Sequence, residues 1–252
     1  MRHFIANMIA LWMPTRVLRD RVRVRIRYPW VPNYVKWVRN YARAHNIPPK
    51  MKICVGFGSK NYVIILNRQY VFKFQLRDPD IKNIYREKRI VDTFQKISPI
   101  KTPGVELIDI GDTIVRKYDF VQGSTLVDLK ASNVLKHRAK IAKQIANFLY
   151  VVGRADPKEL RDLKPDPRAK PGFLYGWFHG DIWQNFMLDP KTFDVIYFID
   201  WEESGFKDFR PSLRDTAHHW ERYKYVGLIV DCVAEYAKLY FGSDEKLPNR
   251  GK

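Results

Sequence analysis

Two short motifs in the second half of the chain combine carboxylates and an amide in a pattern suited to phosphoryl transfer. The first is His179-Gly180-Asp181, which is followed by Asn185. The second is an apolar run that ends at Asp200. Phosphoryl transfer needs a carboxylate that orients the attacking hydroxyl and accepts its proton, and oxygen ligands that hold a metal on the nucleotide phosphates. We therefore expect Asp181 to be the catalytic base, and Asn185 and Asp200 to be the metal ligands.

Residues able to hold a nucleotide occur earlier in the chain. Gly56, Gly58 and Ser59 fall on a predicted strand turn, where free backbone amides could cover phosphates, although an ordinary hairpin turn explains this pattern equally well. Lys73 lies among apolar neighbours in a predicted strand, and an unpaired buried charge is costly. Glu87, in the next predicted helix, is the candidate partner. The alternatives are that Lys73 reaches water from an edge strand and that Glu87 pairs with neighbouring surface cations.

The hydrophobic pattern predicts the elements that must position these residues. Residues 51–121 favour a lobe of five antiparallel strands, at 52–57, 62–66, 70–74, 105–109 and 113–121, with one helix at 81–97. Residues 122–252 favour a mainly helical lobe, with helices expected at 124–129, 134–152 and from 212 onward, and short apolar runs at 173–178, 186–188 and 195–199. The fold class is therefore α+β.

Residues 1–50 form a basic amphipathic N-terminal segment with a single acid, Asp20. Its stretch 4–12 is apolar near helical spacing, and its run 21–27 alternates basic and apolar residues. The alternation favours a strand with one charged face, although a helix fits as well. An apolar face beside a cationic one suits a membrane surface, so we expect residues 1–28 to bind an anionic membrane. The alternative is that this segment docks on the core of the protein itself and its arginines are solvated.

Composition narrows the class of protein. The 252 residues are 46% hydrophobic and carry 45 Lys and Arg against 27 Asp and Glu, a formal net charge of +18. The chain should fold and attract polyanions, but no zinc-finger, RNA-recognition or helix-turn-helix signature predicts nucleic-acid binding. No run reaches the ~18 apolar residues that cross a bilayer, and Cys54 and Cys232 lack metal or redox spacing. We expect a cytoplasmic protein, either free or peripheral at the cytoplasmic face of the inner membrane.

Over roughly residues 50–220 the chain resembles the aminoglycoside phosphotransferase and choline kinase group of kinase-like enzymes. The likeness rests on the His179-Gly180-Asp181 loop with Asn185, and on Ile199-Asp200-Trp201-Glu202. Further on, Asp208, Pro211 and the run 215–217 look like the segment that supports the catalytic loop in that group. The resemblance implies a bilobal protein-kinase-like fold with ATP and Mg²⁺ as cofactors.

The same resemblance assigns further roles by position. Lys73 paired with Glu87 would hold the α- and β-phosphates, and the backbone from Tyr118 to Val121 would be the hinge that holds adenine. One spacing departs from the pattern of the group, since three residues separate Asp181 from Asn185 where the group has four. A loop shorter by one residue would shift the Asn185 amide by up to ~3.5 Å, which makes Gln184 an alternative ligand.

Three functions are compatible with these features. The motifs His-Arg-Asp, Asp-Phe-Gly and Ala-Pro-Glu of protein kinases are absent from the sequence, which favours a small acceptor. Because of the basic N-terminal segment, we expect an ATP-dependent phosphotransferase acting on a hydroxyl of a sugar or membrane-linked glycan, such as the lipopolysaccharide core. The alternatives are a kinase of a soluble small molecule, such as an aminoglycoside or choline, and a non-catalytic kinase-like binding module.

Overall fold

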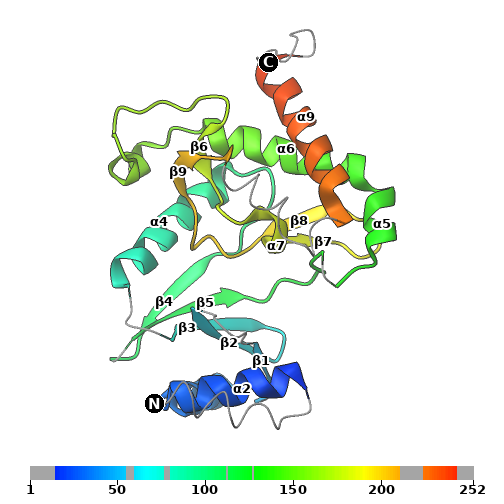
Figure 1. Ribbon diagram of the computed structural model, residues 1–252. Helices are drawn as coiled ribbons and strands as arrows, with labels where there is room; N and C mark the ends of the chain where they lie inside the picture. The colour runs from blue at the N-terminus through cyan, green and yellow to red at the C-terminus, as the bar shows by residue number, and fades with distance from the viewer. Residues whose placement is uncertain are drawn as a thin grey trace. The chain divides into compact units, whose positions relative to one another are not determined.

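The computed structural model describes residues 15–54, 60–76, 80–111, 113–126, 128–210 and 224–242 (Figure 1). They divide into two units. The first contains the described residues up to Ile84 together with Val105–Phe120, and the second contains Tyr85–Gly104 and the residues from Val121 onward. The expected phosphate-binding turn at Gly56, Gly58 and Ser59 lies outside the described residues, and so does the apolar stretch 4–12.

The first unit is built on a five-stranded antiparallel sheet in the order β1-β2-β3-β5-β4. Its strands are β1 (Met51–Cys54), β2 (Asn61–Leu66), β3 (Tyr70–Gln75), β4 (Val105–Asp109) and β5 (Ile114–Asp119). Asn67 and Arg68 turn the chain between β2 and β3 with φ of 49° and 54°, the left-handed geometry that suits a hairpin. Helix α4 (Ile81–Ile97) follows the third strand, so the expected plan of five strands and one helix is confirmed.

Two helices precede the sheet, α2 (Arg16–Arg27) and α3 (Val31–Ala44). The expected strand at 21–27 is therefore wrong. The Thr15 side chain begins α2 by accepting a hydrogen bond from the Leu18 amide at 3.2 Å. Val24 is buried, whereas Val22 and Ile26, which a strand would bury on the same face, are only partly buried, and this pattern decides for the helix.

Helices α2 and α3 share a hydrophobic core with the sheet (Figure 1). Its buried members are Val24, Tyr28, Val31, Tyr34, Val38 and Ala42 from the helices and Tyr62, Ile64, Leu66, Phe72, Phe74, Leu76 and Val115 from the sheet. Tyr34 stacks on Phe74 with ring centroids 4.4 Å apart and donates its hydroxyl hydrogen to the Gln75 carbonyl at 3.2 Å. Part of the basic N-terminal segment thus covers the core of this unit, while Arg21, Arg25 and Arg39 remain exposed.

The second unit combines helices with two small antiparallel ladders. Its elements are α5 (Ala131–Lys136), α6 (Arg138–Arg154), the 3₁₀ helix η1 (Lys158–Leu163), β6 (Tyr175–Phe178), α7 (Ile182–Asn185), β7 (Phe186–Leu188), β8 (Val195–Phe198), β9 (Gly205–Asp208) and α9 (Val226–Phe241). Helices α6 and α9 pack along each other, as Figure 1 shows in green and orange. Strand β6 pairs with β9, and β7 with β8.

Two expectations for the second unit need correction. The expected helix at 124–129 is wrong, because the Asp128 carboxylate accepts hydrogen bonds from the Thr125 amide and hydroxyl at 3.0 and 2.7 Å and closes a turn. Ser124 also exchanges backbone hydrogen bonds with Leu188. The expected helix at 134–152 is two helices, α5 and α6, separated at His137.

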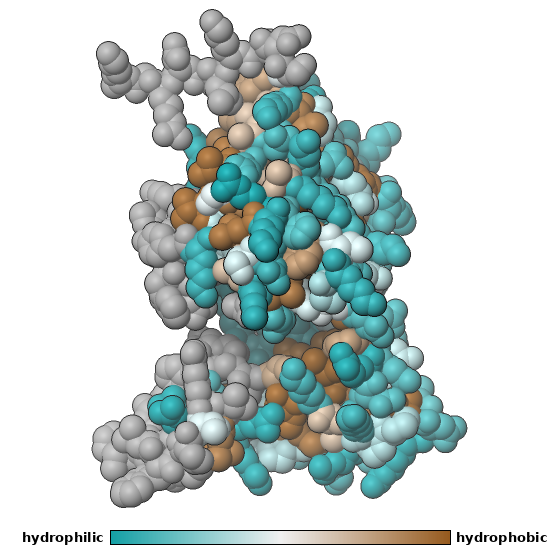
Figure 2. All heavy atoms as spheres, turned by 90° about the vertical axis from the view of Figure 1, so that its right-hand side faces the viewer, coloured by the Kyte–Doolittle hydropathy of each residue, from teal (hydrophilic) through white to brown (hydrophobic). Residues whose placement is uncertain are grey.

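The surface agrees with the charged composition. Hydrophilic residues predominate on the face shown in Figure 2, and hydrophobic ones show there as separate patches. In the described part of the chain, no helix has the length and apolar character needed to span a membrane.

Replacing Phe74 by alanine tests whether the helices and the sheet share one core. Phe74 is 0% exposed, and its loss should lower the free energy of unfolding by about 3–5 kcal/mol, measured by urea denaturation. Tyr85→Ala is the control, because this aromatic side chain is 53% exposed and its removal should cost about 0.5 kcal/mol or less. Equal losses in the two variants would contradict the shared core.

Candidate active site

The two small ladders of the second unit position the candidate catalytic residues. The chain leaves β6 through His179 and Gly180 to reach Asp181, and it leaves β8 through Ile199 to reach Asp200. The last three residues of β6 are buried, as are both ends of β8. Each carboxylate therefore directly follows a strand anchored in the core.

His179 connects these two loops. Its side chain is fully buried, and Nε2 lies 2.9 Å from the Ile199 carbonyl oxygen. Because a carbonyl only accepts hydrogen bonds, Nε2 must carry the proton. The ring also packs against Trp201, with centroids 4.8 Å apart. These contacts make His179 a support for the loops that lead to Asp181 and Asp200.

Asn185 lies beside both loops. Helix α7 is a single turn with Asp181 at its N-cap, and Asn185 Nδ2 donates to the Asp181 carbonyl oxygen at 2.8 Å. The Asn185 carbonyl accepts a hydrogen bond from the Ile199 amide at 2.8 Å. The short spacing between Asp181 and Asn185 thus closes one helical turn, which leaves Oδ1 as the side-chain oxygen for a metal. Gln184, the alternative ligand, is exposed.

The backbone of both loops is held in uncommon conformations. Gly180 has φ of +101°, and a Cβ added there would clash with the Glu203 carbonyl. Asp200 has φ of +61°, a conformation that few residues other than glycine adopt. Such strain persists only where the surroundings determine it, and it is concentrated at functional sites.

Arg86 of α4 holds the segment that follows Asp200. Its guanidinium donates to the Ser204 carbonyl at 2.5 Å and to the Glu202 carbonyl at 2.9 Å. Charge-assisted hydrogen bonds of this kind are stronger than neutral ones. The sequence predicts Arg86 only as one of the surface cations beside Glu87, because no pattern in the sequence marks a distant carbonyl as a partner.

The expected metal ligands suit a magnesium ion by their chemistry. Mg²⁺ prefers oxygen ligands and commonly takes one or two from the protein and others from substrate phosphates. Asp200 supplies a carboxylate and Asn185 an amide oxygen, and the hydrogen bond from Ile199 to Asn185 holds their backbones together. Among the residues that the structure describes, no group of three or more His, Cys, Asp or Glu could hold a metal.

The expected nucleotide-binding residues divide between the two units. Lys73 is 7% exposed and belongs to β3, which lies between β2 and β5, so the alternative of an edge-strand lysine is excluded. Tyr118 lies in β5 and is partly buried, as is Val121, the first residue of the second unit after β5. Glu87 is 0% exposed in the part of α4 that belongs to the second unit. The pairing of Lys73 with Glu87 stays a prediction.

Neighbouring charges in α4 have acidic partners of their own. Lys88 pairs with Asp92 at 2.7 Å, and Arg89 pairs with Asp162 at 2.8 Å. Two of the cations that were alternative partners for Glu87 therefore have carboxylate partners of their own.

One residue of the expected supporting segment is described. Asp208 ends β9 and accepts hydrogen bonds from the backbone amide of Arg210 at 2.8 Å and from its guanidinium group. The Arg210 side chain holds the pKa of this carboxyl below its ordinary value. The rest of that segment, Pro211 and residues 215–217, lies outside the described residues.

Comparison with known proteins identifies the fold. No protein-family model and no curated protein matches the sequence. Solved structures do match. The GDP complex of aminoglycoside 2'-phosphotransferase-IIIa aligns with a TM-score of 0.61 and 14% identity, covering 82% of this chain and 84% of that chain. The gentamicin complex of APH(2")-IIa aligns with a TM-score of 0.62 and 11% identity, covering 80% and 81%.

A macrolide enzyme shares the same architecture. Macrolide 2'-phosphotransferase MphH from Brachybacterium faecium aligns with a TM-score of 0.51 and 12% identity, covering 79% of this chain and 81% of that chain. Structural similarity at such low sequence identity establishes the fold only. The reaction must be inferred from the chemistry of the site. The expected kinase-like fold, of the kind that aminoglycoside phosphotransferases have, is confirmed.

Gly180→Ala tests the close approach of the two loops. The added methyl meets the Glu203 carbonyl and forces an unfavourable φ, so the free energy of unfolding should fall by about 1–3 kcal/mol. Gly172→Ala is the matched control, since the nearest atom to its Cβ is 3.9 Å away. Thermal denaturation of the two variants measures the difference, and a Gly180→Ala protein as stable as the control would disprove the tight packing.

Proposed function

We propose that this chain, which has the fold of the aminoglycoside and macrolide phosphotransferases, transfers the γ-phosphate of ATP to a hydroxyl of a small molecule. The observation that supports the proposal is the frame around Ile199, which joins the Asp181 loop, Asn185 and the Asp200 loop through hydrogen bonds of 2.8–2.9 Å. Structures with this fold were determined with GDP, ATP or ADP, and this favours a purine nucleotide as donor.

In the proposed reaction, the oxygen of the acceptor hydroxyl attacks the γ-phosphorus and the bond to the β–γ bridging oxygen breaks. Asp181 accepts the hydroxyl proton, and ADP leaves with the bond electrons. Asn185 and Asp200 would hold Mg²⁺, which supplies charge neutralisation at the phosphates. The products are a phosphate monoester and ADP.

The remaining expected residues would hold the nucleotide. Lys73, which is buried in the middle of the sheet, would pair with Glu87 and contact the α- and β-phosphates. The Tyr118–Val121 backbone would contact the adenine edge. Gly56, Gly58 and Ser59 would cover the phosphates, as the sequence predicts.

The acceptor is proposed to be a soluble small molecule. The aligned enzymes are aminoglycoside and macrolide phosphotransferases, which favours this class over the membrane-linked glycan expected from the sequence. A net charge of +18 repels polycations, so the acceptor should be neutral or anionic. A sugar or glycan at the membrane remains the second candidate, supported by the exposed arginines of α2 and α3.

Asp181→Asn tests the catalytic base. Transfer of labelled γ-phosphate from ATP, in the presence of Mg²⁺, should fall by about 100-fold or more while the affinity for ATP stays unchanged. Asp166→Asn is the control, because Asp166 lies in an exposed loop and caps only its own turn. Equal transfer by the Asp181 variant and the control would overturn the assigned role.

Asp200→Asn tests the metal ligand by a binding measurement that needs no acceptor. Calorimetric titration should show ATP binding that Mg²⁺ strengthens in the wild type and no longer strengthens in the variant. Wild-type protein that binds no ATP with Mg²⁺ would contradict the proposed function and favour the non-catalytic binding module.

Offering the enzyme two sets of acceptors, soluble compounds and a cell-envelope extract, distinguishes a soluble acceptor from a membrane-linked one. Label is expected in a panel of soluble neutral or anionic hydroxyl compounds, and this label should depend on Asp181. Label that enters only the lipid or glycan fraction of a cell-envelope extract would instead support the membrane-linked acceptor.

A further inference from the structure

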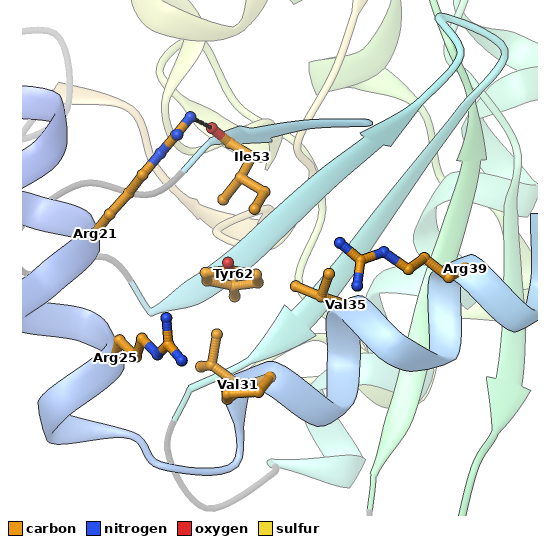
Figure 3. Close-up of a pocket in the computed structure, with 8 residues that line it drawn as sticks. Arg21, Arg25, Val31, Val35, Arg39, Ile53 and Tyr62 are labelled. Atoms are coloured by element: carbon orange, nitrogen blue, oxygen red, sulfur yellow. Dashed lines mark hydrogen bonds between the residues drawn. The ribbon is translucent and has the colours of Figure 1, made fainter. Parts of the chain in front are cut away.

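A basic pocket lies on the helical side of the first unit, formed by residues with no place in the proposed reaction. Its volume is about 320 Å³, and its walls come from α2, α3, β1 and β2 (Figure 3). Arg21 and Arg25 project from α2 and Arg39 projects from α3. In Figure 3 the guanidinium groups of Arg25 and Arg39 point toward each other across the pocket. Three positive charges therefore border one small cavity.

These charges are not neutralised by the protein around them. Within the described ranges, no carboxylate forms an ion pair with Arg21, Arg25 or Arg39. Arg21 donates one hydrogen bond, at 3.2 Å, to the Ile53 carbonyl, which orients its guanidinium at the pocket rim. Asp20, the one acid in this segment, is buried and pairs with Arg23 at 3.6 Å. The field in the pocket is thus positive and favours an anion.

Tyr62 adds a second, independent feature. It is 6% exposed, lines the same pocket, and its hydroxyl makes no hydrogen bond with any other described residue. Burial raises the pKa of this hydroxyl above its ordinary value, while Arg21 and Arg25 act in the opposite direction. Because it has no hydrogen bond to another described residue, this hydroxyl can donate to an acceptor oxygen in the pocket.

The other walls are apolar. Val31, Pro32 and Val35 of α3 and Ile53 of β1 line the cavity between the arginines. Such a surface suits the carbon skeleton of a ligand, and the volume falls within the range of small-molecule sites. The pocket therefore combines several convergent donors with an apolar wall.

We propose that this pocket binds a phosphate monoester through Arg21, Arg25, Arg39 and the Tyr62 hydroxyl. A monoester has three terminal oxygens and up to two negative charges, which match several donors and the bordering guanidinium groups. A phosphodiester has two terminal oxygens and one charge, and it matches them less well. The monoester belongs either to a soluble phosphorylated metabolite or to a lipid such as phosphatidic acid. The ester carbon of either source would lie against the apolar wall.

The test compares two sets of variants in the full chain. Arg25→Gln with Arg39→Gln should weaken binding of the monoester by about 100-fold, and Tyr62→Phe should weaken it by about tenfold. Lys36→Gln with Arg43→Gln is the matched control. These cations of α3 are exposed and lie outside the pocket, and the double substitution removes the same amount of positive charge. The control should change binding by about twofold or less, because cations that do not line the pocket act on its ligand only at long range, where salt screens them. ATP affinity and the melting temperature should stay the same in every variant.

Two probes separate the sources. Calorimetry with glucose 1-phosphate measures the soluble monoester, and sedimentation with phosphatidylcholine vesicles containing phosphatidic acid measures the lipid. Vesicles with phosphatidylglycerol, a diester, should bind at least tenfold more weakly. Binding that depends on Tyr62 and Arg25 with either probe supports the pocket and identifies the source. The proposal is overturned if neither probe binds, or if both double variants lose binding equally.

Discussion

The main chain at Ile199 accepts a hydrogen bond from His179 and donates one to Asn185, and the candidate active site depends on this pair of bonds. Both partners belong to the segment around Asp181, whereas Ile199 immediately precedes Asp200. A carboxylate that accepts a proton and one that holds a metal must keep a constant separation if both are to act on one phosphoryl group. These two hydrogen bonds provide that constancy, because breaking them would leave the amide and carbonyl of Ile199 unsatisfied.

Buried residues of the second unit support the exposed carboxylate of Asp200. Asp200 is itself exposed and its backbone has an uncommon conformation, yet the residues beside it are buried or tied down. Trp201 packs in the core, and Arg86 binds the carbonyl groups that follow. The free energy that maintains the strained residue thus comes from packing and hydrogen bonds on either side of it.

The N-terminal helices serve two physical purposes at once. Their apolar faces complete the core of the first unit, where Tyr34 and Phe74 stack. Their outer faces carry arginines. One of these, Arg21, lies beside the edge strand β1, where it donates a hydrogen bond to the Ile53 carbonyl. The described part of a segment whose composition indicates attraction to anions therefore packs on this unit, and several of its arginines are exposed. The residues proposed to carry out the reaction and those proposed to bind the monoester form separate groups.

Local patterns in the sequence determined the five strands, the helix at 81–97 and the candidate catalytic motif, because strand alternation, helical periodicity and motif spacing are properties of neighbouring residues. The sequence alone could not decide between a strand and a helix at 21–27, since alternating arginine and valine is compatible with both. Packing of Val24 and Tyr28 on the sheet decided it. The roles of Arg86 and Tyr62 likewise depended on tertiary structure, because their surroundings are created by residues far away along the chain.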